Sequence, residues 1–212
     1  EYDSNDGAST HLYSMKKVMD SLSNDPLFEE LANKFGELKL QYTHRDRDDK
    51  DLYEMCSDPL TAYNAGWTPH ADMSVTRNVL LGYAYSDETL AIILKENNKL
   101  IGTISLYQAN IRKNINCREL GFCLNKKYRN LCYMTEAVER ILHYGFYELY
   151  LDLIMVCHHE KNYASKALIN KFPFLYEGTI RMYRRLCDDT IVDGVMYSMK
   201  KEEYWRYKHE RD

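Results

Sequence analysis

The residues from Glu119 to Ala137, ELGFCLNKKYRNLCYMTEA, constrain the fold of this chain more than any other stretch. The first six residues are mostly apolar and predict a strand, in which Gly121 indicates a close approach or a bulge. A polar loop follows, and from Tyr133 onward apolar residues recur at helical spacing. A helix that opens directly after a strand leaves its first amides unpaired, beside the positive end of its dipole. Such a junction can hold a phosphate group.

Length and composition predict one globular domain with an appendage. The chain has 212 residues, enough for one sizeable core, and a net charge of −4, which argues against a protein that mainly grips nucleic acid. No apolar run approaches ~20 residues, so we expect no membrane span. The first residues, EYDSNDGAST, show neither the basic nor the apolar region of a secretory signal.

Six cysteines occur without any CxxC pair, at positions 56, 117, 123, 132, 157 and 187. This spacing favours reduced thiols over a disulfide framework or a zinc site. We therefore expect a cytoplasmic protein with no metal.

Residues 1–36 predict a separate helical extension, ahead of a main domain over residues 37–212. Apolar residues from His11 to Leu22 recur at helical spacing, and Asn24-Asp25-Pro26 is typical of a helix start. Both helices need to bury an apolar face. The sequence leaves open whether they cover the main domain or form a homodimer.

The main domain reads as alternating strands and helices. A continuous apolar run over residues 151–156 is typical of a central strand, and the helix before it predicts a parallel crossover from the strand at 119–124. The sequence thus predicts an α/β fold with a mixed sheet. The expected strands are 38–42, 90–94, 100–107, 119–124, 151–156, 175–185 and 191–199, and the expected helices are 46–56, 74–83, 133–147, 162–172 and a polar C-terminal tail.

The order of these strands and helices, together with the motifs that they carry, resembles the GNAT acetyltransferases, and specifically their RimJ/RimL-type branch, over about residues 38–205. The family's acetyl-CoA loop corresponds to Arg129–Ala137, with Cys132 where the family has its first glycine and Met134 at its second small residue. The other matching segments are Gly66-Trp67, Asn162–Ser165, Lys171–Gly178 and Asp193–Ser198. Their order and spacing carry the resemblance.

The resemblance implies a GNAT fold, with a mixed central sheet of about seven strands flanked by helices. It also implies acetyl transfer from acetyl-CoA to a primary amine by direct attack in a ternary complex. The pantetheine arm would lie where the strand at 119–124 diverges from the strand at 151–156, and a strand amide would act as oxyanion donor. The residues expected to bind acetyl-CoA are Phe122, Cys123, Leu124, Arg129, Asn130, Leu131, Cys132, Tyr133, Met134, Thr135 and Asn162.

The reaction needs two proton transfers, one from the acceptor amine and one to the leaving thiolate. The sequence offers a candidate residue for each. Many GNAT enzymes use a tyrosine as the acid, but Ile169 stands there, so the branch motif offers the hydroxyl of Ser165 instead. Glu119, on the same strand face as Gly121, is the candidate base. Each has an ordinary alternative, Ser165 as a packing residue and Glu119 as a solvated carboxylate. Some RimL-type enzymes have a catalytic carboxylate where this chain has Arg184, which leaves the base open.

The acceptor is expected to be a peptide N-terminus or a small-molecule amine, not nucleic acid or a membrane. About one in ten α-amino groups is neutral at pH 7, against about one in a few thousand lysines. A site without a strong base therefore favours an α-amine. His158 and His159 read as loop residues, and as neighbours they make a poor metal site. Because Cys132 replaces glycine, the alternative is a catalytically weak or inactive GNAT-fold module that binds CoA or a protein partner.

Overall fold

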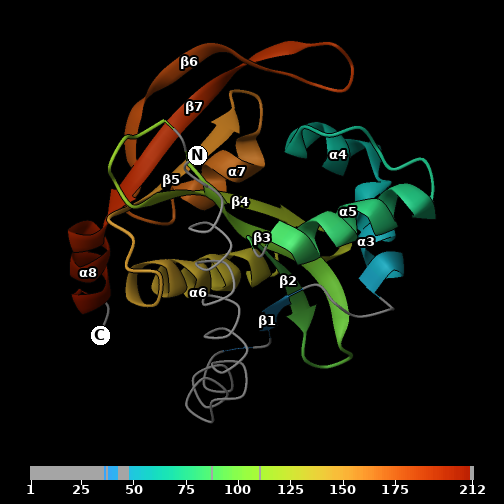
Figure 1. Cartoon of the computed structure of the whole chain (residues 1–212), viewed down its shortest axis with the longest axis horizontal. Coiled ribbons are helices and arrows are strands. Elements are labelled where there is room, and N and C mark those ends of the chain that lie inside the picture. The colour runs from blue at the N-terminus through green and yellow to red at the C-terminus, as the bar shows by residue number, and fades with distance from the viewer. Residues whose placement is uncertain (1–35, 37, 43–47, 87, 110, 211–212) are drawn as a thin grey trace, which may run out of the picture. The chain divides into compact units, whose positions relative to one another are not determined.

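The computed structural model describes residues 36, 38–42, 48–86, 88–109 and 111–210. The predicted N-terminal helices lie outside these residues, so the expected extension and its role in dimerisation remain predictions. In the part described, seven strands form one mixed sheet in the order β1-β2-β3-β4-β5-β7-β6 (Figure 1). This confirms the predicted fold class. The strands are β1 (Leu38–Tyr42), β2 (Thr89–Leu94), β3 (Lys99–Gln108), β4 (Cys117–Leu124), β5 (Leu153–His159), β6 (Leu175–Arg185) and β7 (Ile191–Lys200).

The helices, labelled as in Figure 1, follow the predicted order with one addition. The addition is α4, a short helix that begins at a proline after Asp58 and ends at Gly66, which adopts a left-handed φ of 82°. α7 is shorter than the sequence suggested. The helices of the described residues are α3 (Asp48–Cys56), α4 (Pro59–Ala65), α5 (Met73–Ser86), α6 (Tyr133–Tyr147), α7 (Tyr163–Ile169) and α8 (Lys201–His209).

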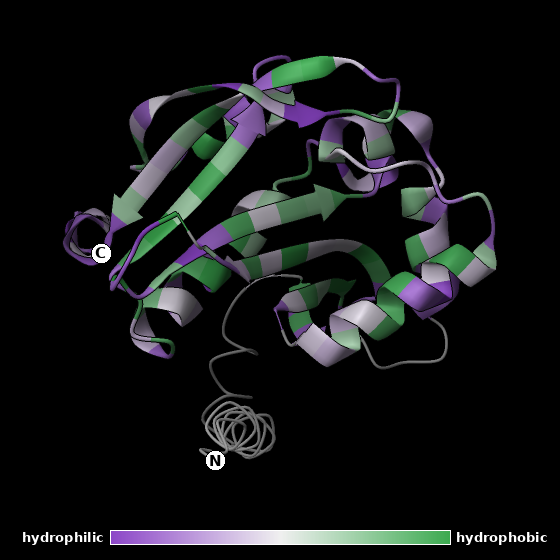
Figure 2. Ribbon diagram, turned by 45° about the horizontal axis from the view of Figure 1, so that its top comes forward, coloured by the Kyte–Doolittle hydropathy of each residue, from purple (hydrophilic) through white to green (hydrophobic). Residues whose placement is uncertain are grey.

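Both faces of the sheet are covered, and the alternation of side chains along each strand assigns residues to the two cores. On one face, α6 buries a stripe that includes Val138, Ile141 and Leu142 against the sheet. On the other face, α3 and α5 pack on β2 and β3, where Ala91 and Ile93 are completely buried. The strands in the middle of the sheet are mainly green in Figure 2, and α8 is mainly purple.

The centre of the sheet contains its one parallel pair among the described strands. β4 pairs with β5 in parallel, and α6 connects them, which confirms the predicted crossover. β3 and β7 flank this pair in antiparallel orientation. Gly121 makes the close approach that its position in β4 indicated, because a Cβ there would lie 2.6 Å from Cε2 of Tyr107. No helix in the described part of the chain is long and apolar enough to cross a membrane.

Candidate active site

The two central strands separate partway along their length. Their pairing runs from Cys117 with Leu153 to Leu120 with Val156 and then stops. Beyond that point β4 remains paired with β3 as far as Leu124, and β5 remains paired with β7 as far as His159. The edges that face each other across the gap therefore have backbone N–H and C=O groups without a ladder partner. An extended ligand with amide groups can pair with such edges.

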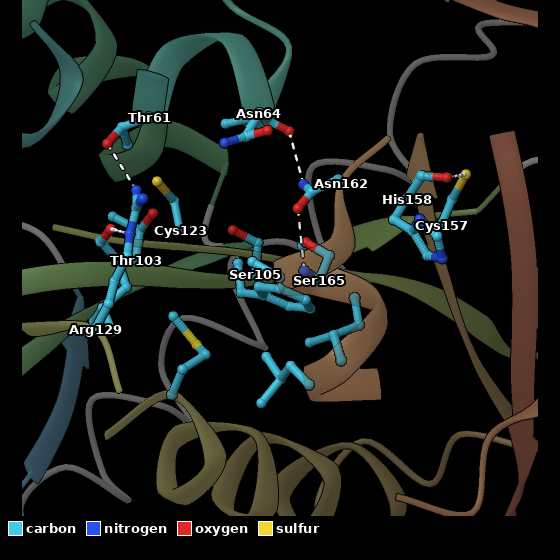
Figure 3. Close-up of a pocket in the computed structure, with 18 of the residues that line it drawn as sticks. Thr61, Asn64, Thr103, Ser105, Cys123, Arg129, Cys157, His158, Asn162 and Ser165 are labelled. Carbon is cyan, nitrogen blue, oxygen red and sulfur yellow. Dashed lines mark hydrogen bonds between the residues drawn. The ribbon is translucent and has the colours of Figure 1, made fainter. Parts of the chain in front are cut away.

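A cavity of about 820 Å³ occupies this gap and opens along the ends of several elements (Figure 3). Its volume is within the range of small-molecule sites. Residues of β3, β4, β5, β6, α4, α6 and α7 line it. The cavity thus reaches from the loop before α6, through the gap between the strands, to the face of the sheet that carries Glu119 and Tyr183.

The loop before α6 is bent into a shape that exposes backbone amides. Asn130 and Cys132 both adopt left-handed conformations, with φ of 63° and 62°. The amide of Glu136 makes the first helical hydrogen bond at this end, 3.0 Å to the carbonyl of Cys132. The amides of Met134 and Thr135, which precede it, have no intrahelical acceptor. Lys171 adds a positive charge at the same end, where its Nζ donates to Oγ1 of Thr135 at 3.1 Å.

Arg129 fixes this loop to two neighbouring elements. Its Nε donates to the carbonyl of Leu124 at the end of β4 (3.2 Å), and its Nη2 donates to Oγ1 of Thr61 on α4 (2.7 Å; Figure 3). The Thr61 hydroxyl in turn donates to Oδ2 of Asp58 at 2.6 Å. Asp58 also bonds Nζ of Lys126 at 2.6 Å, and these contacts lower the pKa of Asp58 to about 2. Arg129 therefore holds the loop against β4 and α4.

Asn162 links α7 to α4. Its Oδ1 accepts from the amide of Ser165 at 3.1 Å and so caps α7, while its Nδ2 donates to the carbonyl of Asn64 at 3.1 Å. These bonds place the half-buried Ser165 in the first turn of α7, on the wall of the cavity (Figure 3). The amide of Asn162 thus positions the helix that carries the hydroxyl.

Glu119 also lines the cavity, together with Cys157 of β5 and Tyr183 of β6. Burial raises the pKa of Glu119, and the positive charge of Arg184 opposes that rise. Burial also raises the pKa of Tyr183, and raises that of Cys157 to about 11, so both stay protonated at neutral pH.

The structure corrects the interpretation of the histidine pair. His158 and His159 are the last two residues of β5, not loop residues, and they are 5% and 7% exposed. Burial lowers the pKa of His159, with smaller contributions from His158 and Arg184. His159 is therefore neutral at pH 7, with its ring edge-on to Tyr63 at a centroid distance of 5.9 Å.

The structure brings nearly all the sequence-predicted site residues to one cavity. Only Leu131 lies off its wall, with its side chain 56% exposed. The others line the wall: Glu119, Phe122, Cys123, Leu124, Arg129, Asn130, Cys132, Tyr133, Met134, Thr135, Asn162 and Ser165.

Sequence reasoning missed the contributions of α4 and β6. Thr61 and Asn64 come from α4, whose Asp-Pro start and glycine end were visible signals. Nothing in the sequence around Tyr183 indicated that this residue would line the cavity.

Comparison with known proteins gives a consistent assignment. A family model described as "Acetyltransferase (GNAT) domain" matches residues 39–174. An uncharacterized N-acetyltransferase, p20 of Bacillus licheniformis, is 30% identical over 159 residues, which cover 72% of this chain and 87% of the relative.

Two solved structures have the same fold. A GNAT-family acetyltransferase from Bacillus anthracis superposes with a TM-score of 0.69 at 24% identity, covering 79% of this chain and 97% of that one. A spermidine N-acetyltransferase from Vibrio cholerae, solved with CoA and spermine, gives a TM-score of 0.67 at 14% identity, covering 80% of this chain and 98% of that one.

Proposed function

The chain belongs to the GNAT family of acetyltransferases, and from that membership we propose that it is a RimJ/RimL-type enzyme that acetylates primary amines. The observation that carries the proposal is the early end of the β4–β5 pairing, with one cavity reaching both the gap and the Glu119 face. Acetyl-CoA supplies the thioester, and an amine approaching from the Glu119 face would meet it at the gap. Proximity and electrostatics then provide most of the rate acceleration.

The residues around the gap fit acetyl-CoA. The left-handed loop and the first amides of α6 form a cradle for the pyrophosphate, and Lys171 places a cation beside it. The free edges of β4 and β5 would pair with the amides of the pantetheine arm. Phe122, Cys123 and Leu124 contribute the β4 edge in this proposal.

The conformation of this loop also bears on the alternative function, a GNAT-fold module that only binds CoA or a protein partner. The reason for that alternative is that Cys132 stands where the family has glycine. Cys132 nevertheless adopts the left-handed φ that the loop requires, so the loop keeps its shape. Met134 is already inside α6, where a side chain does not disturb the backbone. The geometry therefore favours an active enzyme.

Ser165 and Glu119 are assigned the two proton transfers. Ser165 would donate a proton to the leaving thiolate, since it lines the cavity at the start of α7. Glu119 would accept the proton of the amine, and burial raises its pKa toward that role. A carboxylate, even one with a raised pKa, is a weaker base than an amine, which favours an acceptor amine with a low pKa, such as a peptide α-amine.

Two further properties belong to the proposal. The free cysteines fit a reducing compartment, so we place the protein in the cytoplasm. The expected helices of residues 1–36 would serve either the main domain or a homodimer.

Two measurements test the function. Isothermal titration with acetyl-CoA should show binding, and the absence of binding at millimolar concentration would contradict the enzyme reading. Thiol release should then be screened with N-terminal peptides, polyamines and aminoglycosides as acceptors. Release with a peptide α-amine at the highest kcat/KM would support the assignment, whereas binding of acetyl-CoA without release for any acceptor would favour the non-catalytic module.

A further inference from the structure

Arg184 follows a bulge in β6, where residues 181–183 lie opposite Asp193 alone. In the middle of the bulge Met182 adopts a left-handed φ of 53°, and its amide donates to Oδ1 of Asp193 at 2.8 Å. A bulge of this kind changes the direction in which the following side chains point. The two residues that follow Met182, which are Tyr183 and Arg184, both line the cavity.

The side chain of Arg184 crosses from β6 to the end of α4. Its Nη1 donates to the carbonyl of Ala65, 3.2 Å away. The guanidinium also lies directly on Gly66, where an added Cβ would overlap Nη1. The positive charge thus stands at the C-terminal end of α4, where a helix carries partial negative charge. Because Ala65 lines the cavity as well, this contact forms part of the cavity wall.

Most of the hydrogen-bonding capacity of Arg184 is available to a ligand. A guanidinium has five N–H groups in one plane, and the contact with Ala65 uses one of them. Within the part of the chain that the structure describes, no carboxylate pairs with Arg184, whereas the neighbouring Arg185 pairs with Asp189. Arg184 is therefore an exposed cation on the cavity wall, and its planar set of donors matches a carboxylate.

The other charged residues of the cavity wall show which part of the cavity Arg184 serves. Arg129 holds the loop before α6 and Lys171 lies at the start of that helix, so both belong to the end proposed for the pyrophosphate. Glu119 is the only carboxylate among the described residues that line the cavity. Glu119 and Arg184 act on each other, because the charge of Arg184 opposes the rise in the pKa of Glu119. One negative and one positive side chain complement an acceptor that carries both an amine and a carboxylate, and they disfavour a polyamine.

We propose that Arg184 determines the acceptor specificity of this enzyme by binding a carboxylate that lies close to the acceptor amine. The inference rests on the proposed function, since it concerns the acceptor of the same site. The carboxylate has two possible sources with the same chemistry, an acidic side chain near a peptide N-terminus and the α-carboxylate of a free amino acid. In both cases the amine lies on the Glu119 side of the bound carboxylate.

Matched acceptors test the preference. Two C-terminally amidated peptides, with aspartate or asparagine after an N-terminal alanine, differ by one charge at nearly constant size. We expect the aspartate peptide to have a kcat/KM about tenfold higher in the wild type, the lower end for a hydrogen bond to a charged group because Arg184 is exposed. Free alanine and alaninamide form a second pair, which distinguishes the two sources of the carboxylate. For both pairs the wild type is compared with the variants, because that ratio cancels differences in amine pKa.

Three variants separate binding of the carboxylate from a purely structural role. Arg184→Gln removes the charge and keeps a donor for the Ala65 carbonyl, so the preference for aspartate should fall to within about twofold. Arg184→Lys keeps the charge without the planar donors and should retain a preference of about threefold. Arg185→Gln is the matched control, because it removes the same charge from a neighbouring side chain that does not line the cavity, and it should keep the preference of about tenfold.

The outcomes decide between the two roles. An arginine that only caps α4 would give equal losses with both peptides in Arg184→Gln. That result, the absence of a preference in the wild type, or a higher kcat/KM for spermidine than for the aspartate peptide would overturn the proposal.

Titration calorimetry in the presence of CoA gives a measurement that does not need turnover. The aspartate peptide should bind about tenfold more tightly than the asparagine peptide to the wild type and to Arg185→Gln, and the difference should disappear in Arg184→Gln. That result without thiol release from any acceptor would refute the proposed function and leave the Arg184 site standing. Thiol release without any preference for the charged acceptors would overturn the Arg184 proposal alone.

Discussion

Replacing Cys132 with glycine should stabilise the protein. Cys132 immediately precedes α6 with φ 62° and ψ −1°, a left-handed conformation in which its Cβ crowds the following carbonyl. That crowding costs roughly 1–2 kcal/mol, and glycine avoids it. Glycine also has more freedom to lose on folding, which takes back roughly 0.5–1 kcal/mol. The net expectation is a gain of about 0.5–1 kcal/mol in the free energy of unfolding.

Thermal unfolding under reducing conditions measures this gain. For a domain of this size the gain corresponds to a rise in Tm of about 1–4 °C. Cys132→Ala is the matched control, since it removes the thiol and keeps the Cβ, and its Tm should stay within about 1 °C of the wild type by the same scaling. A rise in the alanine variant equal to that in the glycine variant would refute the backbone explanation and point to the thiol.

The same two variants separate stability from ligand binding. Because the left-handed conformation is already present, both variants should bind acetyl-CoA within about threefold of the wild type, less than the factor of ten that 1.4 kcal/mol represents. Titration calorimetry checks this point. A gain of tenfold or more with glycine would mean that cysteine holds the loop away from its binding conformation.

Three further predictions concern the site and the contacts that support it. Ser165→Ala should lower kcat by about tenfold or more and leave acetyl-CoA binding unchanged. A fall in kcat of less than threefold would mean that Ser165 is a packing residue and not the proton donor. Iodoacetamide should modify the exposed Cys132 and Cys187 first, and acetyl-CoA should protect only Cys132; equal labelling of Cys132 with and without it, in mapped peptides, would place the phosphates elsewhere. Asp58→Asn should cost about 1 kcal/mol at pH 7 after solvent screening, and only a small part of that near pH 2. Since its partners hold the pKa of Asp58 at about 2, below the usual 3.8, the ionised form stabilises the fold, and most of that stability is lost as pH falls from about 4 to 2. Urea unfolding curves of the two proteins that lie as far apart at pH 2 as at pH 7 would contradict the ion-pair explanation.

The crossover from β4 through α6 to β5 could be predicted because its signals are local. The apolar residues of α6 repeat at helical spacing over four turns, and the helix begins at Tyr133 as expected. The strands around it are long enough to show as apolar runs. α4 was missed because seven residues carry too little periodicity, although Asp58 and Gly66 marked both ends.

The geometry around Tyr183 could not be predicted, because it depends on register. β6 was expected over the correct residues, but nothing in its own sequence shows that three residues lie opposite Asp193. The prediction that His158 and His159 lie in a loop was wrong for a related reason. β5 continues through His159 by pairing with β7 after β4 has moved away, and a polar strand end looks like a loop when that partner is unknown.

Anchoring at both ends explains how the loop before α6 accommodates Cys132 in a left-handed conformation. Each of the strands beside it keeps a ladder on its outer edge, β4 with β3 and β5 with β7. Arg129 fixes the loop to the end of β4 and to α4, and the helical hydrogen bonds of α6 fix its other end. With both ends held, Cys132 needs only to keep its amide in place, and a local strain of about 1–2 kcal/mol is small beside the stability of a domain. The glycine of the family loop is therefore replaceable here, at a cost in stability and not in the position of the amides.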